Sequence, residues 1–169
     1  MKQKFFTKIL VATMLFVSIA NAKAGRIAVL DFNASVGITQ SDVDGISAIF
    51  LTHFSPQGFT LVERTQINRV ISEQGFQRSA LTNQQMVRVG QILNLSHIVI
   101  GDVNIVSGRF NLDVRVVCVQ TGEIVARDGT DWARASAPRE PMRILAQRLA
   151  QRVPQPTAPP PPPPPRIRF

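Results

Sequence analysis

The sequence predicts one α/β domain of the α+β kind, built on a mixed sheet of about five strands with about four flanking helices. Two features indicate this class. In the first half, short β-rich runs alternate with amphipathic helical stretches, and in the second half three strands follow one another with only tight turns between them. About 145 of the 169 residues remain once an N-terminal leader is set aside, which is enough to enclose one core.

The first predicted strand is Arg26–Phe32, a short run of residues that favour β structure. An amphipathic helix is expected next, because apolar residues recur at helical spacing between residues 43 and 54 and Ser41 is a good N-cap. Phe59–Glu63 is the second predicted strand. This part of the domain is therefore expected to run strand, helix, strand.

Two more helices are expected before the next strand. Thr65 can cap the first of them, and Gly75 stops it. Thr82 opens the second, and Gln85 three residues later completes a capping box. Gly90 lies inside this helix, where glycine costs stability, so we expect close packing against a neighbouring element there.

The second half predicts an antiparallel meander of three strands. These are His97–Ile105, Phe110–Val119 and Glu123–Trp132, with turn signals at Ser107-Gly108 and Thr121-Gly122. The middle strand alternates in polarity, so one of its faces should be buried and the other partly wet. Its residues divide into Leu112, Val114, Val116 and Cys118 on one face and Asp113 and Arg115 on the other.

A last amphipathic helix, about Arg139–Val153, closes the domain, which we place at residues 25–153. Residues 154–169 form a proline-rich tail that cannot enclose a core, so we expect disorder or extended chain there. Pro159–Pro165 would make a spacer of about 22 Å. The tail is either a peptide ligand, with Arg166, Arg168 and Phe169 as partner contacts, or an inert linker.

The N-terminus has the three parts of a secretory signal peptide, residues 1–22. Lys2, Lys4 and Lys8 precede an apolar run of about a dozen residues, Ile9–Ala20, and small residues in A-x-A spacing follow. We expect cleavage after residue 22 or 24. The alternative is a short membrane anchor, but a spanning helix needs roughly 20 apolar residues. No cysteine stands at the cut site, so we expect an exported, unlipidated periplasmic protein, held at the outer membrane, if at all, by a partner.

The net charge of +8 is unevenly distributed. Cleavage would remove the leader together with its three lysines. Residues 23–137 hold ten Lys and Arg against ten Asp and Glu. The basic excess lies from residue 138 onwards, with six Arg and one Glu. A neutral globular part argues against nucleic-acid binding, which needs a basic surface to neutralise phosphates.

The residues capable of chemistry are few, and we predict no enzyme, no metal and no cofactor. The chain has two histidines, His53 and His97, and one cysteine, Cys118, which cannot form an internal disulfide. His97 and Cys118 would make a base and a nucleophile only with a third group to orient them. We expect both histidines to be structural and the cysteine to fill the core as an apolar residue.

Two carboxylates leave a weaker enzymatic hypothesis open. Asp31 ends the first strand and Asp102 lies inside a later one, so the two would be neighbours if those strands pair. A hydrolase using either is the third hypothesis, and the structural alternative is an aspartate that closes a turn or accepts backbone hydrogen bonds. Glu63 and Arg64 are expected to stabilise a strand-to-helix junction.

The stretch from Leu61 to Val103, followed by VRVVCVQTGEIVA, resembles the CsgG family of bacterial envelope proteins. The resemblance begins at RIAVLDF and covers nearly all of the predicted domain. The shared elements are a strand ending in Glu63-Arg64, a helix with Asn68, the Gly90 helix, the strand IVIGDV and a final hairpin. The motif residues, which we expect to be structural, are Glu63, Arg64, Asn68, Glu73, Gln74, Gly75, Gly90, Gly101, Thr121, Gly122 and Glu123.

The resemblance implies a place in the cell envelope. The family includes the curli-secretion channel and is related to LpoB-type lipoprotein activators of penicillin-binding proteins. Channel members carry an N-terminal lipid and two long membrane-crossing hairpins, whereas this sequence has only IVSGRF and TDWARASAPRE at those places. These segments are too short to cross about 30 Å of hydrocarbon and return, so no pore is expected.

We therefore predict a non-enzymatic periplasmic accessory protein of the CsgG type. It would dock, without a cofactor, to an envelope protein partner in a secretion complex or a cell-wall synthesis complex. The alternative is a structural subunit of a ring or scaffold, a homo-oligomer formed by self-assembly of the domain.

Overall fold

The computed structural model describes residues 24–77 and 81–155 and confirms the predicted fold class. The predicted signal peptide and the tail residues Arg166, Arg168 and Phe169 lie outside the described residues. Within the described ranges, none of the helices combines the length and apolarity needed to cross a membrane. The elements are β1 (Gly25–Val29), β2 (Asn33–Ala34), α1 (Gln40–His53), β3 (Phe59–Leu61), α2 (Arg64–Glu73), α3 (Asn83–Ile92), β4 (His97–Val106), β5 (Arg109–Cys118), β6 (Ile124–Ala133) and α4 (Arg139–Arg152).

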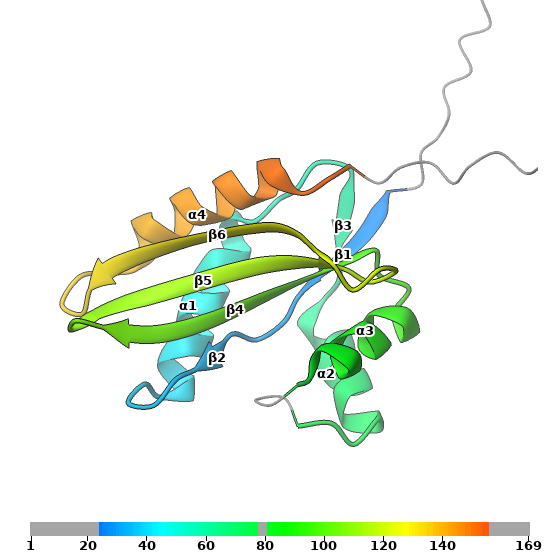
Figure 1. Cartoon of the computed structure of the whole chain (residues 1–169), viewed down its shortest axis with the longest axis horizontal. Helices are drawn as coiled ribbons and strands as arrows, with labels where there is room; N and C mark the ends of the chain where they lie inside the picture. Colours follow the sequence, from blue (N-terminus) through cyan, green and yellow to red (C-terminus); the bar gives the residue numbers. More distant parts are fainter. Residues whose placement is uncertain (1–23, 78–80, 156–169) are drawn as a thin grey trace, which may run out of the picture.

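The strands form one mixed sheet in the order β3-β1-β4-β5-β6, and the two-residue strand β2 adds to β4 beyond the end of β1. β1 runs parallel to both β3 and β4. β4, β5 and β6 are antiparallel, as the turn signals at residues 107–108 and 121–122 predict. The long strands of this meander extend well past β1 and β3, so one end of the sheet is only three strands wide (Figure 1).

Helices cover the two faces of the sheet unequally (Figure 1). α1 and α4 pack together along one face and bury the larger core against β1, β4, β5 and β6. α2 and α3 lie on the other face, where a second core joins them to β1 and to the nearby ends of β4 and β5. Because this second pair of helices is short and sits at one end, the rest of its face carries no helix within the described chain.

The predicted N-caps of two helices are each wrong by two residues. Thr39, not Ser41, caps α1, and its hydroxyl accepts a hydrogen bond from the Asp42 backbone at 3.2 Å. α2 begins at Arg64, one residue before the predicted cap Thr65, with Glu63 in the N-cap position and no side-chain cap. The predicted capping box of α3 is confirmed, because the side chains of Thr82 and Gln85 each accept from the other's backbone nitrogen.

Two glycines mark places where elements approach closely. A Cβ on Gly90 of α3 would lie 2.6 Å from a methyl group of Val119, which confirms the close packing predicted there. A Cβ on Gly101 of β4 would collide with the ring of Phe32. Phe32 in turn packs edge-on to Phe50 of α1, so this glycine lets an aromatic cluster lie flat on the sheet.

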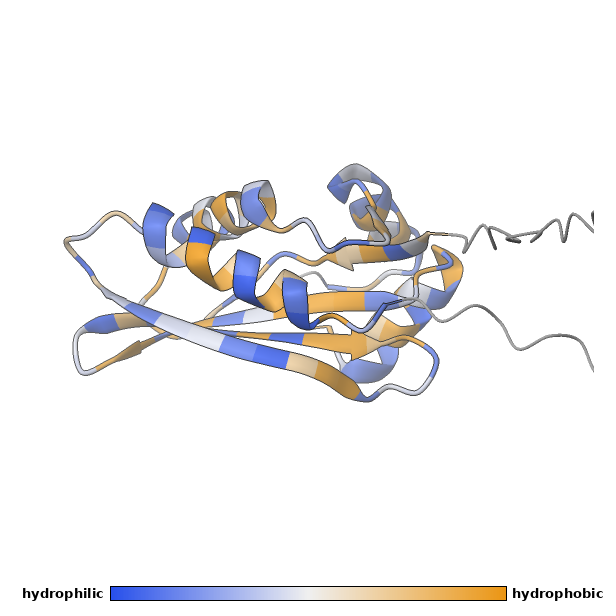
Figure 2. Cartoon of the chain, turned by 90° about the horizontal axis from the view of Figure 1, so that it is seen from above, coloured by the Kyte–Doolittle hydropathy of each residue, from blue (hydrophilic) through white to orange (hydrophobic). Residues whose placement is uncertain are grey.

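The three long strands change character along their length. β6, the strand nearest the viewer in Figure 2, is hydrophobic beside its hairpin with β5 and becomes mainly hydrophilic towards its other end. Side chains alternate between the faces, as predicted for β5: Leu112, Val114 and Val116 are buried, and Asp113 is exposed. Cys118 differs from the prediction, because it is half-buried and does not fill the core.

Candidate functional site

The part of the sheet that α2 and α3 leave uncovered is the candidate site. We call it the open face: the far side of β4, β5 and β6 from α1 and α4. Strand register decides which side chains share it, because residues directly opposite in a ladder point the same way. Its polar side chains are Asp102, Asn104, Arg109, Asn111, Asp113, Arg115, Arg127 and Asp131.

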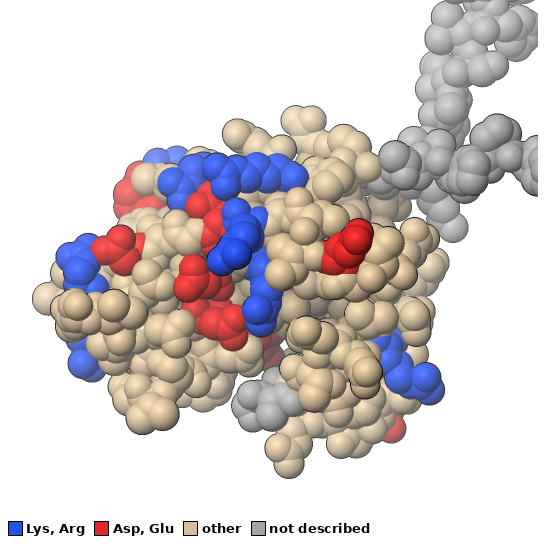
Figure 3. All heavy atoms as spheres, viewed as in Figure 1, with Lys and Arg blue, Asp and Glu red and all other residues tan. Residues whose placement is uncertain are grey.

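The register sorts the open face into rows that run across the strands. The apolar row holds Ile98, Val117 and Ile124. The next position is two residues along β4 and β5, and three along β6 because of a bulge; it holds the basic row, Arg115 and Arg127 beside Ile100. Two residues further is the acidic row, Asp102 and Asp113 beside Gly129. Figure 3 shows the result, an acidic patch next to a basic patch over the middle of these strands.

The acidic row places like charges directly opposite each other, which is unfavourable in a strand pair. Asp102 is compensated: it lies 3.2 Å from the Arg115 guanidinium and accepts a hydrogen bond from the Asn33 amide at 2.8 Å. Asp113 is exposed, and within the described ranges it has neither an ion-pair nor a hydrogen-bond partner. One carboxylate of the row is therefore left to solvent or to a ligand.

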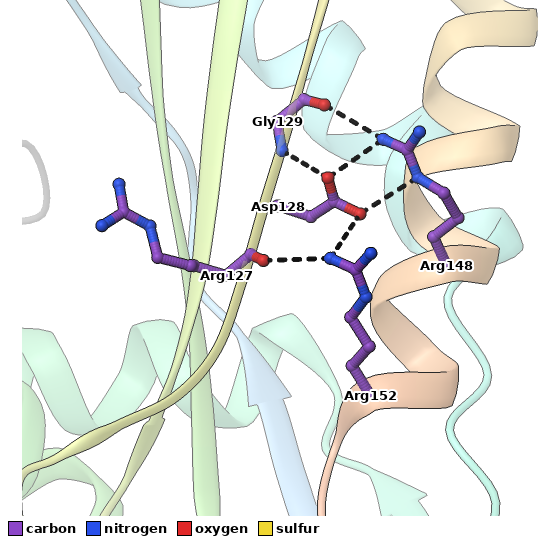
Figure 4. Close-up of polar contacts among 5 residues, drawn as sticks. All are labelled: Arg127, Asp128, Gly129, Arg148 and Arg152. Atoms are coloured by element: carbon purple, nitrogen blue, oxygen red, sulfur yellow. Dashed lines mark hydrogen bonds and ion pairs between the residues drawn. The ribbon is translucent and has the colours of Figure 1, made fainter.

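The basic row repeats this asymmetry. Arg115 is engaged by Asp102, whereas the Arg127 side chain opposite it is exposed and forms no ion pair within the described part of the chain. Figure 4 shows the Arg127 side chain leaving β6 on the side away from α4, towards the open face. Adjacent rows are about 7 Å apart, two residues at about 3.4 Å each. The two uncompensated charges therefore belong to neighbouring rows and adjacent strands.

An apolar cleft of about 450 Å³ adjoins the rows. It lies between the first turns of α3 and the β5–β6 hairpin, and its floor is formed by Ile98, Ile100, Val117 and Val119. Uncharged amide side chains, among them Asn83 and Gln120, line its rim. The cleft meets a second hollow of about 100 Å³ through Arg115 and Ile124, which line both. Apolar cleft and charged rows thus form one continuous surface.

The opposite side of β6 is closed by an ion-pair cluster (Figure 4). Arg148 of α4 makes two 3.0 Å contacts with the Asp128 carboxylate, and Arg152 lies 3.2 Å from it. The same guanidinium groups donate to the backbone carbonyls of Gly129 and Arg127, and Asp128 accepts from the Gly129 N–H. These bonds occupy outward-facing backbone groups of the sheet edge, so an added strand would have to displace them.

The two aspartates of the hydrolase hypothesis do not form a carboxylate pair. Asp31 lies 3.0 Å from the Arg64 guanidinium, while Asp102 is held by Arg115 and Asn33. Arg64 also donates to the Ser47 hydroxyl, which ties the start of α2 to α1. Arg64 thus joins the start of α2 to Asp31 and to α1, while the junction role predicted for Glu63 and Arg64 stays a prediction.

The remaining motif residues of the CsgG resemblance occupy turns, helix ends and close contacts. Asn68 lines a hollow of about 10 Å³ beside Asp31, and Glu73 lies 3.9 Å from Arg69. Gln74 is the C-cap of α2, and Gly75 follows it in a left-handed conformation at φ 67°. Thr121 accepts a hydrogen bond from the Glu123 backbone, and Gly122 has φ 73°. Their status as motif residues stays a prediction.

His97 and Cys118 lie directly opposite each other in the β4–β5 ladder, but the imidazole and the thiol form no hydrogen bond. Burial lowers the pKa of His97, whose Nδ1 lies 3.2 Å from the Ser96 hydroxyl. Burial raises the pKa of Cys118, but hydrogen bonds with Thr121 and Gln120 outweigh it and the net shift is downward. Nowhere in residues 24–77 or 81–155 do three potential metal ligands come together.

No family model and no curated protein matches the chain. Among solved structures, the C-terminal domain of LpoB from Salmonella enterica is similar, with a TM-score of 0.52 at 13% identity over 69% of this chain and 87% of that one. The NMR structure of Escherichia coli LpoB has a TM-score of 0.51 at 17% identity over 66% of this chain and 58% of that one. Lipoprotein GNA1162 from Neisseria meningitidis aligns at 12% identity with a TM-score of 0.49 over 66% of this chain and 82% of that one. The chain therefore has the fold of the LpoB C-terminal domain, while membership of the CsgG family stays a prediction.

Proposed function

We propose that this chain is a non-enzymatic accessory protein of the bacterial envelope, exported to the periplasm without a lipid. It binds an envelope protein, in a secretion complex or a cell-wall synthesis complex, through the open face. The LpoB-like fold is compatible with this proposal, but a fold hosts many functions, so the argument rests on the site.

The observation that carries the proposal is the continuity of the apolar cleft with the charged rows. Protein-binding sites combine a desolvated apolar centre with a polar rim that fixes orientation. Here Ile124 is 54% exposed beside the cleft, and Arg127 and Asp113, which have no ion-pair partner among the described residues, stand one and two rows away. The domain itself gains little from any of the three, since a core does not require an exposed isoleucine or unpaired charges.

Site-specific photo-crosslinking in intact cells tests this proposal. A photoreactive residue replaces Asp113, Arg127 or Ile124 in turn, and Thr52, exposed on α1 at the opposite face, is the matched control position. We expect one heavier adduct from the three open-face positions and none from Thr52. Adducts of equal yield from all four positions, or from Thr52 alone, would contradict docking through the open face.

The composition of the adduct separates this function from the alternative. An adduct that contains a second envelope protein supports the accessory role. An adduct whose mass is a multiple of this chain supports the ring or scaffold formed by self-assembly. Mass spectrometry of the purified adduct distinguishes the two outcomes directly.

A further inference from the structure

We infer that the open face recognises an extended peptide segment in which an apolar, an acidic and a basic residue follow one another at alternate positions. This inference rests on the proposed function and names the chemistry of the partner. The segment would place its apolar side chain in the cleft, its acid over the basic row and its base over the acidic row.

The spacing of the rows sets the spacing of the ligand. Along β4 and β5 the rows are two residues apart, which is about 7 Å, while on β6 a bulge places Ile124 three residues before Arg127. An extended chain lying along the strands also presents every second side chain to the sheet at about 7 Å. Its residues i, i+2 and i+4 therefore face the three rows in turn, whereas helical residues four apart, about 6 Å along the axis, fall out of step by the third row.

The order of charges sets the order in the ligand. Reading away from the cleft, the basic row comes first and the acidic row second. Among residues 24–77 and 81–155, Arg127 and Asp113 have no ion-pair partner, so they can bind a carboxylate and a cation respectively. A segment with the two charges exchanged would bring like charges together, and like-charge contacts discriminate strongly against a wrong partner.

The cleft supplies the anchor. Its volume of about 450 Å³ is in the range of small-ligand sites, and its floor is aliphatic. An aromatic side chain buries a large apolar area there at a low cost in conformational entropy. The amide groups of Asn83 and Gln120 at the rim can bond the peptide backbone without adding charge.

Two peptides of identical composition test the inference against the whole folded protein. Both have blocked ends; one reads Phe-Thr-Glu-Thr-Arg-Thr and the other Phe-Thr-Arg-Thr-Glu-Thr. Binding is followed by NMR titration of the ¹⁵N-labelled protein. We expect the first peptide to bind about tenfold more tightly, as two exposed charge pairs allow, with shifts at the amides of Val117, Arg115 and Asp113. Equal affinities, or no binding of either peptide, would overturn the inference.

The double variant Asp113→Arg with Arg127→Asp makes each row electrically mixed, because Asp102 and Arg115 remain. We expect it to bind both peptides with similar affinity, while Ile124→Ser weakens both by a similar factor. Raising the salt concentration should shrink the preference in the wild-type protein, a readout that needs no variant. A preference that survives both changes would contradict charge recognition. If neither peptide binds but the open-face positions still form crosslinks in cells, only this inference is contradicted. If the open-face positions form no crosslinks, the proposed function is contradicted.

Discussion

The two faces of β4, β5 and β6 are built from alternate residues of the same strands and carry side chains of opposite character. On the face towards α1 and α4, residues such as Val103, Leu112 and Val116 are fully buried and continuous with the helix side chains. One residue along, Asp102 and Asp113 meet solvent. Where α2 and α3 leave the sheet uncovered, the buried apolar side chains therefore lie on the closed face alone, and the open face carries the polar pattern for which we propose a binding role.

Electrostatics sharpens the contrast between the faces. On the closed side, Asp128 has two guanidinium groups and a backbone N–H around it, so its charge is fully compensated. On the open side, the register sets Asp113 against Asp102 and Arg127 against Arg115. An isolated domain would be slightly more stable without those like-charged pairs, and a bound partner would compensate them.

The largest expected effect is a loss of packing on the closed face. Leu145 of α4 is fully buried in the larger core, so Leu145→Ala should lower the free energy of unfolding by about 2–5 kcal/mol. Asp113→Ala on the open face should change it by less than about 0.5 kcal/mol. Urea unfolding followed by circular dichroism measures both. Similar losses of unfolding free energy in the two variants would contradict the claim that the closed face contributes more to stability than the open face.

The next largest effects are expected from two glycine-to-alanine substitutions, which should change the free energy of unfolding in opposite directions. Gly101→Ala would push a methyl group into the ring of Phe32 and should cost about 1–3 kcal/mol. Gly45→Ala in α1 meets nothing within 4 Å, so it should stabilise the protein by up to about 1 kcal/mol. Thermal unfolding of the two variants is the measurement. A stabilising Gly101→Ala would mean that Phe32 moves aside freely.

The ion-pair cluster at the edge of β6 should give a smaller loss. Asp128→Asn weakens the contacts with Arg148 and Arg152, and we expect a cost of about 1 kcal/mol because both arginines remain partly in solvent. Asp131→Asn, which removes an exposed pair with Arg109, should cost less than about 0.5 kcal/mol. Equal values for the two variants, measured by urea unfolding, would show that closure of the edge adds no stability.

Local sequence patterns predicted the elements because each one carries its own signal. The Thr82–Gln85 capping box, the left-handed Gly75 and the alternation from Leu112 to Val116 are all fixed by near neighbours in the chain. The first cap of α1 was misplaced because Thr39 and Ser41 are both good caps, and only the structure shows which hydroxyl meets a free N–H.

The candidate site could not be predicted in the same way, because it depends on register between three strands. The rows depend on the turns at Ser107-Gly108 and Thr121-Gly122 and on a bulge at residues 116–117. The turns could be predicted from the sequence, but the bulge could not. The Asp128 cluster joins residues 20 and 24 positions apart on different elements. Such contacts leave no periodic trace, so they become visible only after the fold is known.

The smallest expected effect is a pH dependence that originates beside the closed core. Burial holds the pKa of His97 below the ordinary value of 6.5, so in acid the unfolded chain takes up a proton that the folded protein resists. The free energy of unfolding should therefore fall as pH drops from about 6.5 towards the lower folded pKa, and stay reduced below it. His97→Gln removes this contribution but leaves His53 and all carboxylates in place. Urea unfolding at pH 7.5 and pH 5.5 should show a steeper loss in the wild type than in this variant; parallel losses would mean that His97 protonates as easily in the folded state as in the unfolded one.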